Sequence, residues 1–146
     1  MKSVYLYPST CLFEGTMMSL GRGTPFPFQV YGHPDMKGRT FSFTPQSMFG
    51  AKNPPLLGKL CYGVDLRNMS DKEIREKGFD LIYLIDAYQS LNIGDRFFSP
   101  FFEKLIGVDY VRKMIKDGKS AEVIKAVWKN DVENFKKQRQ PYLLYE

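Results

Sequence analysis

Residues 59–77, KLCYGVDLRNMSDKEIREK, contain the point at which the chain changes from strands to helices. The first part, KLCYGVDL, is rich in apolar and aromatic side chains, which is typical of a central β-strand. Ser70 and Glu73 follow with the spacing of a capping box, in which each side chain accepts a hydrogen bond from the backbone of the other residue. We therefore predict a strand followed by a helix at this point.

On the N-terminal side of this point, the sequence predicts further short strands. They lie at residues 3–7, 28–31 and 39–44, and each is followed directly by Pro or Gly. Residues 11–13 fit either a second short strand or a buried turn. Residues 46–58, which are rich in Gly and Pro, fit an ordered loop or a mobile flap.

On the C-terminal side, apolar residues recur at helical spacing. The helix that begins at Ser70 is expected to be interrupted at Gly78 and to continue through Tyr88. Ser99, followed by a proline, predicts the start of a short helix that ends at Gly107.

Two more helices are predicted at residues 109–117 and 121–139. The second is closed by Pro141 and is expected to bury Val123, Ile124, Val127, Trp128 and Phe135. The order of elements predicts the α+β class: a short mixed or antiparallel sheet from the N-terminal half, packed against C-terminal helices.

The composition is that of a globular domain. The chain has 146 residues, of which 43% are hydrophobic and 15% aromatic, which excludes a disordered chain. It has no run of about 18 apolar residues, and its start, MKSVYLYPST, has no long apolar segment followed by a cleavage site. We expect a single domain over residues 1–146, with no membrane span and no signal peptide in this chain.

The net charge of +5 raises the question of a nucleic-acid partner. The basic excess lies between residues 113 and 139, interleaved with acids on predicted helices. This pattern is typical of a solvated helix face, and no RNP-like, helix-turn-helix or zinc-finger motif accompanies it. We predict no nucleic-acid partner; a polyanion-binding patch is the alternative.

The chain has few cysteines and histidines, the residues that most often hold structural zinc. Cys11 and Cys61 each lie in an apolar run, which predicts two buried free thiols, with a disulfide as the alternative. His33 is the only histidine, and there is no CxxC pair, so we expect neither a zinc site nor a cofactor. Because no nucleophile motif accompanies His33, we expect it to have a structural or substrate-lining role.

Residues 7–28, YPSTCLFEGTMMSLGRGTPFPF, form the segment most typical of a binding site. They place Glu14, Arg22 and several hydroxyl side chains among glycines, which allow a backbone to approach a ligand closely. A hydrophilic surface connection without a ligand is the alternative.

The two charged residues of this segment each fit two roles. Glu14 can act as an acid or accept the hydroxyls of a sugar, or it can cap a turn. Arg22, between two glycines, can bind a carboxylate or phosphate through parallel hydrogen bonds. An internal ion pair with Glu14 is the alternative and is compatible with a shared site. The phenylalanines between residues 97 and 102 predict core or, with Tyr62, a sugar-stacking wall.

Several motifs in combination resemble one bacterial family. They are CLFEGTMMSLGRGTPFPFQVYGHP at 11–34, FTP at 43–45, GKLCYGVDL at 58–66, RFFSPFFEKLIG at 96–107 and QPYLLYE at 140–146. Together they resemble the C-terminal portion of the NamZ-type exo-β-N-acetylmuramidases, formerly a bacterial domain of unknown function. The resemblance covers essentially the whole chain.

The resemblance implies a Rossmann-like N-terminal domain followed by this smaller auxiliary domain, with the active site in the cleft between them. Enzymes of this family release N-acetylmuramic acid from the non-reducing ends of peptidoglycan fragments, and they are commonly exported. The lactyl or peptide carboxylate of such a ligand would give Arg22 a partner. By resemblance, the substrate-binding residues that face or border the cleft are Glu14, Thr16, Ser19, Arg22, Thr24, His33 and Thr44.

Two departures from the family pattern bear on activity. The chain begins where the second domain would begin, so the domain expected to hold the principal catalytic carboxylate is missing, and Glu14 is the one catalytic candidate left. The region between residues 33 and 41 also looks shorter than is usual. We expect a substrate-contacting half-site that is inactive, or nearly so, alone. The alternative is a free-standing carbohydrate- or anion-binding module.

Overall fold

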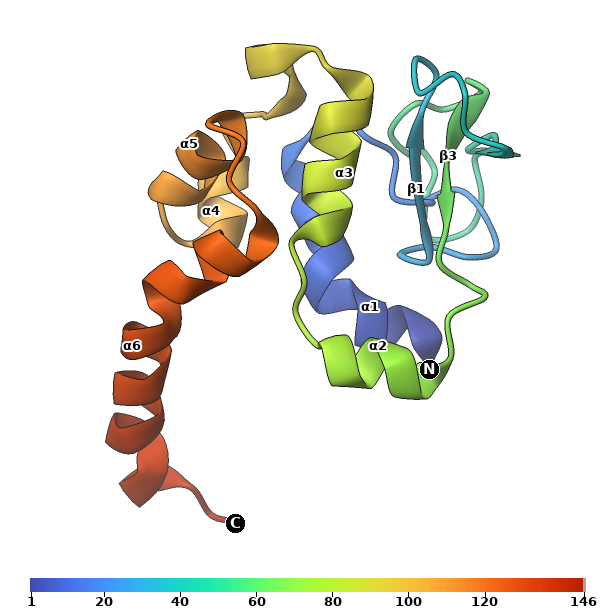
Figure 1. Cartoon of the computed structure of the whole chain (residues 1–146). Helices are drawn as coiled ribbons and strands as arrows, with labels where there is room; N and C mark the ends of the chain where they lie inside the picture. Colours follow the sequence, from blue (N-terminus) through green and yellow to red (C-terminus); the bar gives the residue numbers. More distant parts are fainter. Residues whose placement is uncertain (146) are drawn as a thin grey trace.

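The structure is a computed structural model that describes residues 1–145. The first and last of the described elements are helices, and a small sheet lies to one side of the central helices (Figure 1). This combination confirms the predicted α+β class. In chain order, the elements are α1 (Lys2–Thr10), the 3₁₀-helix η1 (Cys11–Gly15), β1 (Val30–His33), β2 (Phe41–Phe43), β3 (Cys61–Asp65), α2 (Asp71–Lys77), α3 (Ile82–Leu91), η2 (Gly94–Phe97), α4 (Phe102–Ile106), α5 (Tyr110–Lys116), α6 (Ala121–Arg139) and η3 (Gln140–Tyr142).

The sheet has three antiparallel strands in the order β1-β3-β2, so β3 is the central strand, as the sequence predicted. Gly32 of β1 faces Gly63 of β3. A Cβ atom on Gly63 would lie 1.9 Å from the carbonyl oxygen of Tyr31, a distance that no side chain tolerates. The glycines therefore permit the close approach of the two strands.

Residues 3–7 belong to α1, so the prediction of a strand there was wrong. α1 packs against η1, α2 and α3. It buries Leu6 and Ser9, which lie three residues apart on one helix face. The Ser9 hydroxyl donates to the Gly78 carbonyl at 3.3 Å and accepts the Asp80 N–H at 2.9 Å. These tertiary contacts outweigh the β propensity of the segment.

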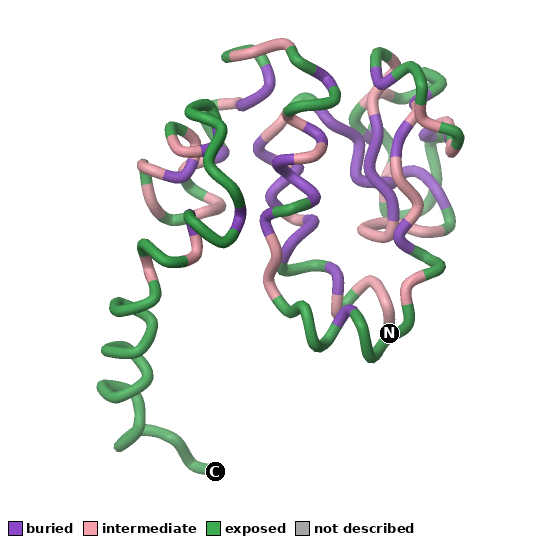
Figure 2. Tube along the Cα trace, in the orientation of Figure 1, coloured by how far each residue is buried: buried purple, intermediate pink, exposed green. Residues whose placement is uncertain are grey.

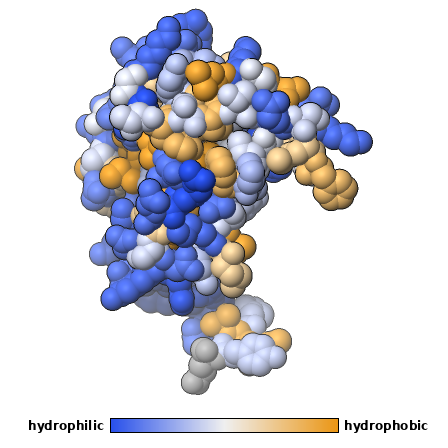
Figure 3. Space-filling model, turned by 90° about the vertical axis from the view of Figure 1, so that its right-hand side faces the viewer, coloured by the Kyte–Doolittle hydropathy of each residue, from blue (hydrophilic) through white to orange (hydrophobic). Residues whose placement is uncertain are grey.

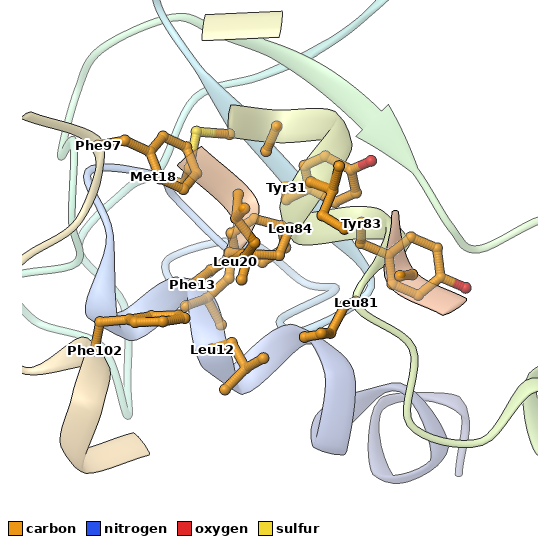
Figure 4. Packing of buried hydrophobic residues seen from close by; sticks show 14 of the residues in the cluster. Leu12, Phe13, Met18, Leu20, Tyr31, Leu81, Tyr83, Leu84, Phe97 and Phe102 are labelled. Atoms are coloured by element: carbon orange, nitrogen blue, oxygen red, sulfur yellow. The ribbon is translucent and has the colours of Figure 1, made fainter. Parts of the chain in front are cut away.

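The main core includes Phe13, which comes from η1, so residues 11–13 form the buried turn rather than a second strand. The Phe13 ring is fully buried and stacks on Tyr31, with 4.8 Å between ring centroids. Buried residues follow the inner sides of the sheet and the central helices (Figure 2). Figure 4 shows side chains from separate elements meeting in this core, among them Leu20, Leu84 and Phe102.

The predicted capping box is confirmed at the start of α2. The Ser70 hydroxyl accepts the Glu73 N–H at 3.2 Å, and the Glu73 carboxylate accepts the Ser70 N–H at 2.7 Å. α2 ends before Gly78, and α3 begins four residues after that glycine, so the predicted interruption is also confirmed.

α4 begins later than predicted. Pro100 was expected at the first helical position, but the helix begins at Phe102. Ser99 organises the turn before it, because its hydroxyl accepts the Phe101 N–H and its carbonyl accepts the Phe102 N–H, both at 3.2 Å. Gly107, with a φ of 78°, ends the helix as predicted.

α6 covers the predicted residues. The predicted burial is confirmed for Ile124 and wrong for Val123, Val127 and Phe135. Only Ala121 and Ile124 are buried in this helix. Trp128 is half-buried, and the exposed fractions are 48% for Val123, 50% for Val127 and 61% for Phe135. Most of α6 extends away from the other elements and so meets no core within residues 1–145 (Figures 1 and 2). None of the helices described, α6 included, is long and apolar enough to span a membrane.

We predict that Gly63→Ala destabilises the chain by about 2 kcal/mol or more, because the added methyl group collides with the facing strand. Urea or thermal unfolding measures the change. Ser42→Ala, at an exposed position of β2, is the control and should shift stability by less than about 0.5 kcal/mol. Equal stability of the two variants would contradict the pairing of β1 with β3.

Candidate functional site

Glu14 is held at the surface by its two buried neighbours. Phe13 before it is fully buried in the core. Gly15 after it packs directly against α4. A Cβ atom on Gly15 would lie 2.6 Å from the Cα of Phe102. The Ser99 N–H donates to the Gly15 carbonyl at 2.9 Å and fixes this contact. The side chain of Glu14 is therefore positioned by rigid backbone and is 27% exposed.

Arg22 forms an internal ion pair with Glu14, which the sequence analysis gave as the alternative to ligand binding. Its Nε and Nη2 both donate to one carboxylate oxygen, Oε1, at 2.9 and 2.7 Å. Within residues 1–145, neither the second oxygen of Glu14 nor Nη1 of Arg22 has a hydrogen-bond partner. With side chains 40% and 27% exposed, the pair contributes at most about 1 kcal/mol to stability. It therefore leaves both groups able to bind a ligand.

The hydroxyl residues of the loop make hydrogen bonds within the loop itself. Thr16 donates to the carbonyl three residues before it at 2.8 Å and accepts the N–H two residues after it at 3.1 Å. Thr24 repeats this arrangement at 2.6 and 3.2 Å. Ser19 and Thr24 are buried. These hydroxyls shape the loop, and their contact with a ligand stays a prediction.

His33 and Thr44 lie at the borders of this loop. Backbone hydrogen bonds of 2.9 Å join Ser19 to the residue before His33. Thr44 lies two residues before Gln46, whose N–H donates to the loop at Gly23 at 2.8 Å. Within residues 1–145, neither side chain makes a hydrogen bond or ion pair with Glu14 or Arg22. Their roles in substrate binding also stay predictions.

An aromatic pair that the sequence did not indicate lies beside Arg22. The rings of Tyr7 and Phe28 have centroids 5.0 Å apart, and the Arg22 guanidinium carbon lies 5.1 Å from the Phe28 centroid. Phe28 has a φ of 64°, which costs about 1–2 kcal/mol for a residue with a Cβ atom. No propensity rule predicts this conformation for Phe. Of the aromatic residues that the sequence did indicate, Phe97, Phe98 and Phe102 are buried in the core, whereas Phe101 is 47% exposed and Tyr62 is half-buried.

A second polar cluster, also missed by sequence reasoning, joins β1 to α3. The Tyr31 hydroxyl donates to Asp86 at 2.8 Å, and Arg39 donates to Asp86 and to Ser90, both at 2.6 Å. Burial, reinforced by the Asp86 carboxylate, raises the pKa of Tyr31 far above its usual range, so the phenol stays protonated and remains a donor. Tyr31 and Asp86 are 55 residues apart in the chain, so no local motif indicates the pair.

Both cysteines are free thiols as predicted, but the predicted burial holds only for Cys61, because Cys11 is half-buried. Burial raises the pKa of Cys61 to about 11. Burial, with the nearby Glu14 carboxylate, also raises the pKa of Cys11. Both thiols are therefore protonated near neutral pH and are poor nucleophiles. Across residues 1–145, no three His, Cys, Asp or Glu side chains form a cluster that could hold a metal ion.

The fold and the site define an α+β domain that presents a half-exposed Glu–Arg pair beside two aromatic rings. Residues 5–145 match the family model described as Exo-beta-N-acetylmuramidase NamZ, C-terminal. Because the match spans nearly the whole chain, the chain belongs to this family, which confirms the resemblance of its motifs.

Two relatives extend this comparison. Peptidoglycan beta-N-acetylmuramidase NamZ of Bacillus subtilis (strain 168) is 31% identical over 163 residues, which cover 99% of this chain and 38% of that protein. The crystal structure of a DUF1343 family protein from Bacteroides fragilis NCTC 9343 is similar with a TM-score of 0.98 and 69% identity, over 100% of this chain and 41% of that one. The chain thus spans about two fifths of the length of these relatives.

We predict that His33 titrates below its ordinary pKa of 6.5, because burial disfavours the charged ring and outweighs the attraction of Asp35. As His33 is the only histidine, its NMR signal is assigned without ambiguity. Since the unfolded chain takes up the proton first, stability should fall as the pH is lowered below about 6.5. His33→Gln should remove this part of the pH dependence. A midpoint at or above 6.5 would contradict the described burial.

Proposed function

We propose that this chain is the auxiliary, substrate-contacting domain of an exo-β-N-acetylmuramidase, a glycoside hydrolase that acts on peptidoglycan fragments during cell-wall degradation and recycling. Membership of the family supports the class of enzyme. The name of the Bacillus subtilis relative supports the class of substrate. The observation that carries the proposal is the Glu14–Arg22 pair, which is half-exposed and incompletely bonded.

The free edge of Arg22 fits the chemistry of N-acetylmuramic acid. This sugar carries a lactyl carboxylate, or a peptide carboxylate beyond it. Glu14 uses one edge of the guanidinium, formed by Nε and Nη2, and leaves the edge that includes Nη1. A carboxylate can accept two parallel hydrogen bonds from that edge. The free oxygen of Glu14 can accept a hydrogen bond from a hydroxyl or amide N–H of the same sugar.

The chemical step is proposed to depend on residues outside this chain. Most glycosidases use two carboxylates that flank the scissile bond, about 5–9.5 Å apart. One carboxylate oxygen of Glu14 accepts both hydrogen bonds from Arg22. This arrangement suits a residue that positions the substrate better than it suits the principal catalytic acid. We propose that a Rossmann-like N-terminal domain supplies the principal carboxylate, and that the substrate binds in the cleft between the two domains.

The remaining predicted residues support this site in our proposal. Thr16, Ser19 and Thr24 keep the loop in the conformation that pairs Arg22 with Glu14. His33 and Thr44 border the loop and line the same wall of the cleft. No cofactor and no nucleic acid take part. By itself, the chain is expected to be inactive or nearly so, because one half of the site cannot position the reacting groups.

A two-domain chimera tests the function. Residues 1–146 replace the matching region of the Bacillus subtilis relative, which is named as a beta-N-acetylmuramidase, and release of N-acetylmuramic acid from a chromogenic glycoside is measured. We predict activity for the chimera and none for residues 1–146 alone. An inactive chimera, together with micromolar binding of muropeptides by residues 1–146 alone, would contradict the proposal and support a free-standing binding module.

Within the active chimera, we predict that Arg22→Ala raises KM at least about tenfold, because a hydrogen bond to a charged group contributes about 1.5–3 kcal/mol. Arg22→Lys should recover only part of the loss, since lysine cannot make two parallel bonds. Arg75→Ala is the matched control. Arg75 also lies over an aromatic ring, that of Tyr5, but it belongs to α2 and not to the Glu14–Arg22 site. Unchanged kinetics for Arg22→Ala would remove the site assignment.

A further inference from the structure

Tyr7, Phe28, Arg22 and Glu14 form a continuous row on the surface. The Tyr7 ring, 48% exposed, contacts the Phe28 ring at a tilt of 56°. The Arg22 guanidinium lies over the Phe28 ring, and Arg22 in turn pairs with Glu14. The row is therefore apolar at one end and charged at the other. Aromatic faces next to a cation and an acceptor are the groups that bind a polar ring with an apolar face.

A hollow lies at the apolar end of this row. It has a volume of about 310 Å³ and is lined by Ser3, Val4, Tyr7 and Phe28. Val4 is 65% exposed, so the apolar surface of the hollow is open to solvent. The volume is at the lower end of the range for small-molecule sites, about 300–1,000 Å³. A single sugar residue therefore fits the scale of the hollow. Figure 3 views the sheet side of the molecule, where exposed apolar groups lie among polar ones.

The fold holds Phe28 in its left-handed conformation from two sides. The Phe28 N–H donates to the Leu20 carbonyl at 2.8 Å. The carbonyl before Phe28 accepts from the Ser3 hydroxyl at 3.0 Å, and the Phe28 carbonyl lies 3.3 Å from the Thr10 hydroxyl, whose one hydrogen is shared with the Leu6 carbonyl at 3.0 Å. Both hydroxyls come from α1, which also carries Tyr7. An unfavourable backbone conformation that is fixed in this way points to a functional orientation of the side chain, here against Tyr7 and under Arg22.

We propose that Tyr7 and Phe28 form an aromatic subsite for the ring of an N-acylated amino sugar, while Arg22 binds a carboxylate substituent of the same sugar. This inference rests on the proposed function and adds the surface that receives the sugar ring. The apolar C–H face of the pyranose lies on the exposed aromatic surface. The free oxygen of Glu14 accepts a hydrogen bond from the amide N–H or a hydroxyl. N-acetylmuramic acid has all three groups, whereas N-acetylglucosamine lacks the carboxylate.

NMR titration of the 146-residue chain with N-acetylmuramic acid and with N-acetylglucosamine tests the subsite. The expected result is that N-acetylmuramic acid shifts the signals of Tyr7, Phe28 and Arg22, and that N-acetylglucosamine binds at the same residues at least tenfold more weakly. Shifts that are confined to Arg22, or signals of Tyr7 and Phe28 that N-acetylmuramic acid leaves unmoved, would overturn the aromatic subsite.

Phe28→Gly removes the ring and relieves the left-handed strain, but it also deletes a partly buried side chain that packs against the core. We expect a lower Tm and an affinity for N-acetylmuramic acid at least tenfold lower. Phe135→Ala, which removes an exposed ring from α6, is the matched control and should leave the affinity unchanged. Tyr7→Ala is therefore the deciding variant, since it removes a ring that is 48% exposed and does not touch the strained backbone.

The two proposals fail in different ways. Wild-type affinity in both Phe28→Gly and Tyr7→Ala would overturn the subsite and leave the proposed function standing. In contrast, an inactive chimera would count against the proposed function even if the aromatic residues bind the sugar. Loss of affinity in both aromatic variants, with the control unchanged, would support the subsite.

Discussion

The contact between Gly15 and Phe102 joins the two halves of the chain, and the position of the site depends on it. At this point the backbone of η1 lies against the backbone of α4, so close that a Cβ atom on residue 15 would be 2.6 Å from the Cα of Phe102. The hydrogen bond from Ser99 to Gly15 fixes the separation. Because Glu14 lies between this contact and the buried Phe13, the backbone on both sides holds its carboxylate at the surface.

The Glu14–Arg22 pair illustrates how a modest surface interaction can serve recognition better than stability. A half-exposed ion pair adds little to the free energy of folding. It does fix the plane of the guanidinium, and it leaves the other edge of that group unbonded within residues 1–145. The ring of Phe28 supports the guanidinium from a second direction. Pre-organised donors of this kind cost less entropy when a ligand carboxylate binds.

Local patterns in the sequence predicted the parts of the fold that local physics decides. The central strand and the capping box of α2 were found because their patterns lie within a few residues. Residues 3–7 were wrongly assigned to a strand, since the contacts that make them helical come from Gly78 and Asp80, about seventy positions away. The exposed face of α6 was missed because periodicity shows which face is apolar, but not whether anything covers it.

The candidate site also contains some residues that local sequence predicts and others that only the folded structure reveals. Glu14 and Arg22 were predicted because they are charged residues in a glycine-rich segment. Phe28 was not predicted, because its position depends on a left-handed backbone conformation that no sequence pattern indicates for Phe. A crystal structure of the chain with N-acetylmuramic acid bound would show directly whether Arg22 binds the carboxylate of the sugar. We predict that the lactyl carboxylate lies within about 3 Å of Nη1 or Nη2 of Arg22. A bound sugar whose carboxylate contacts other residues, with Arg22 facing only Glu14, would contradict it.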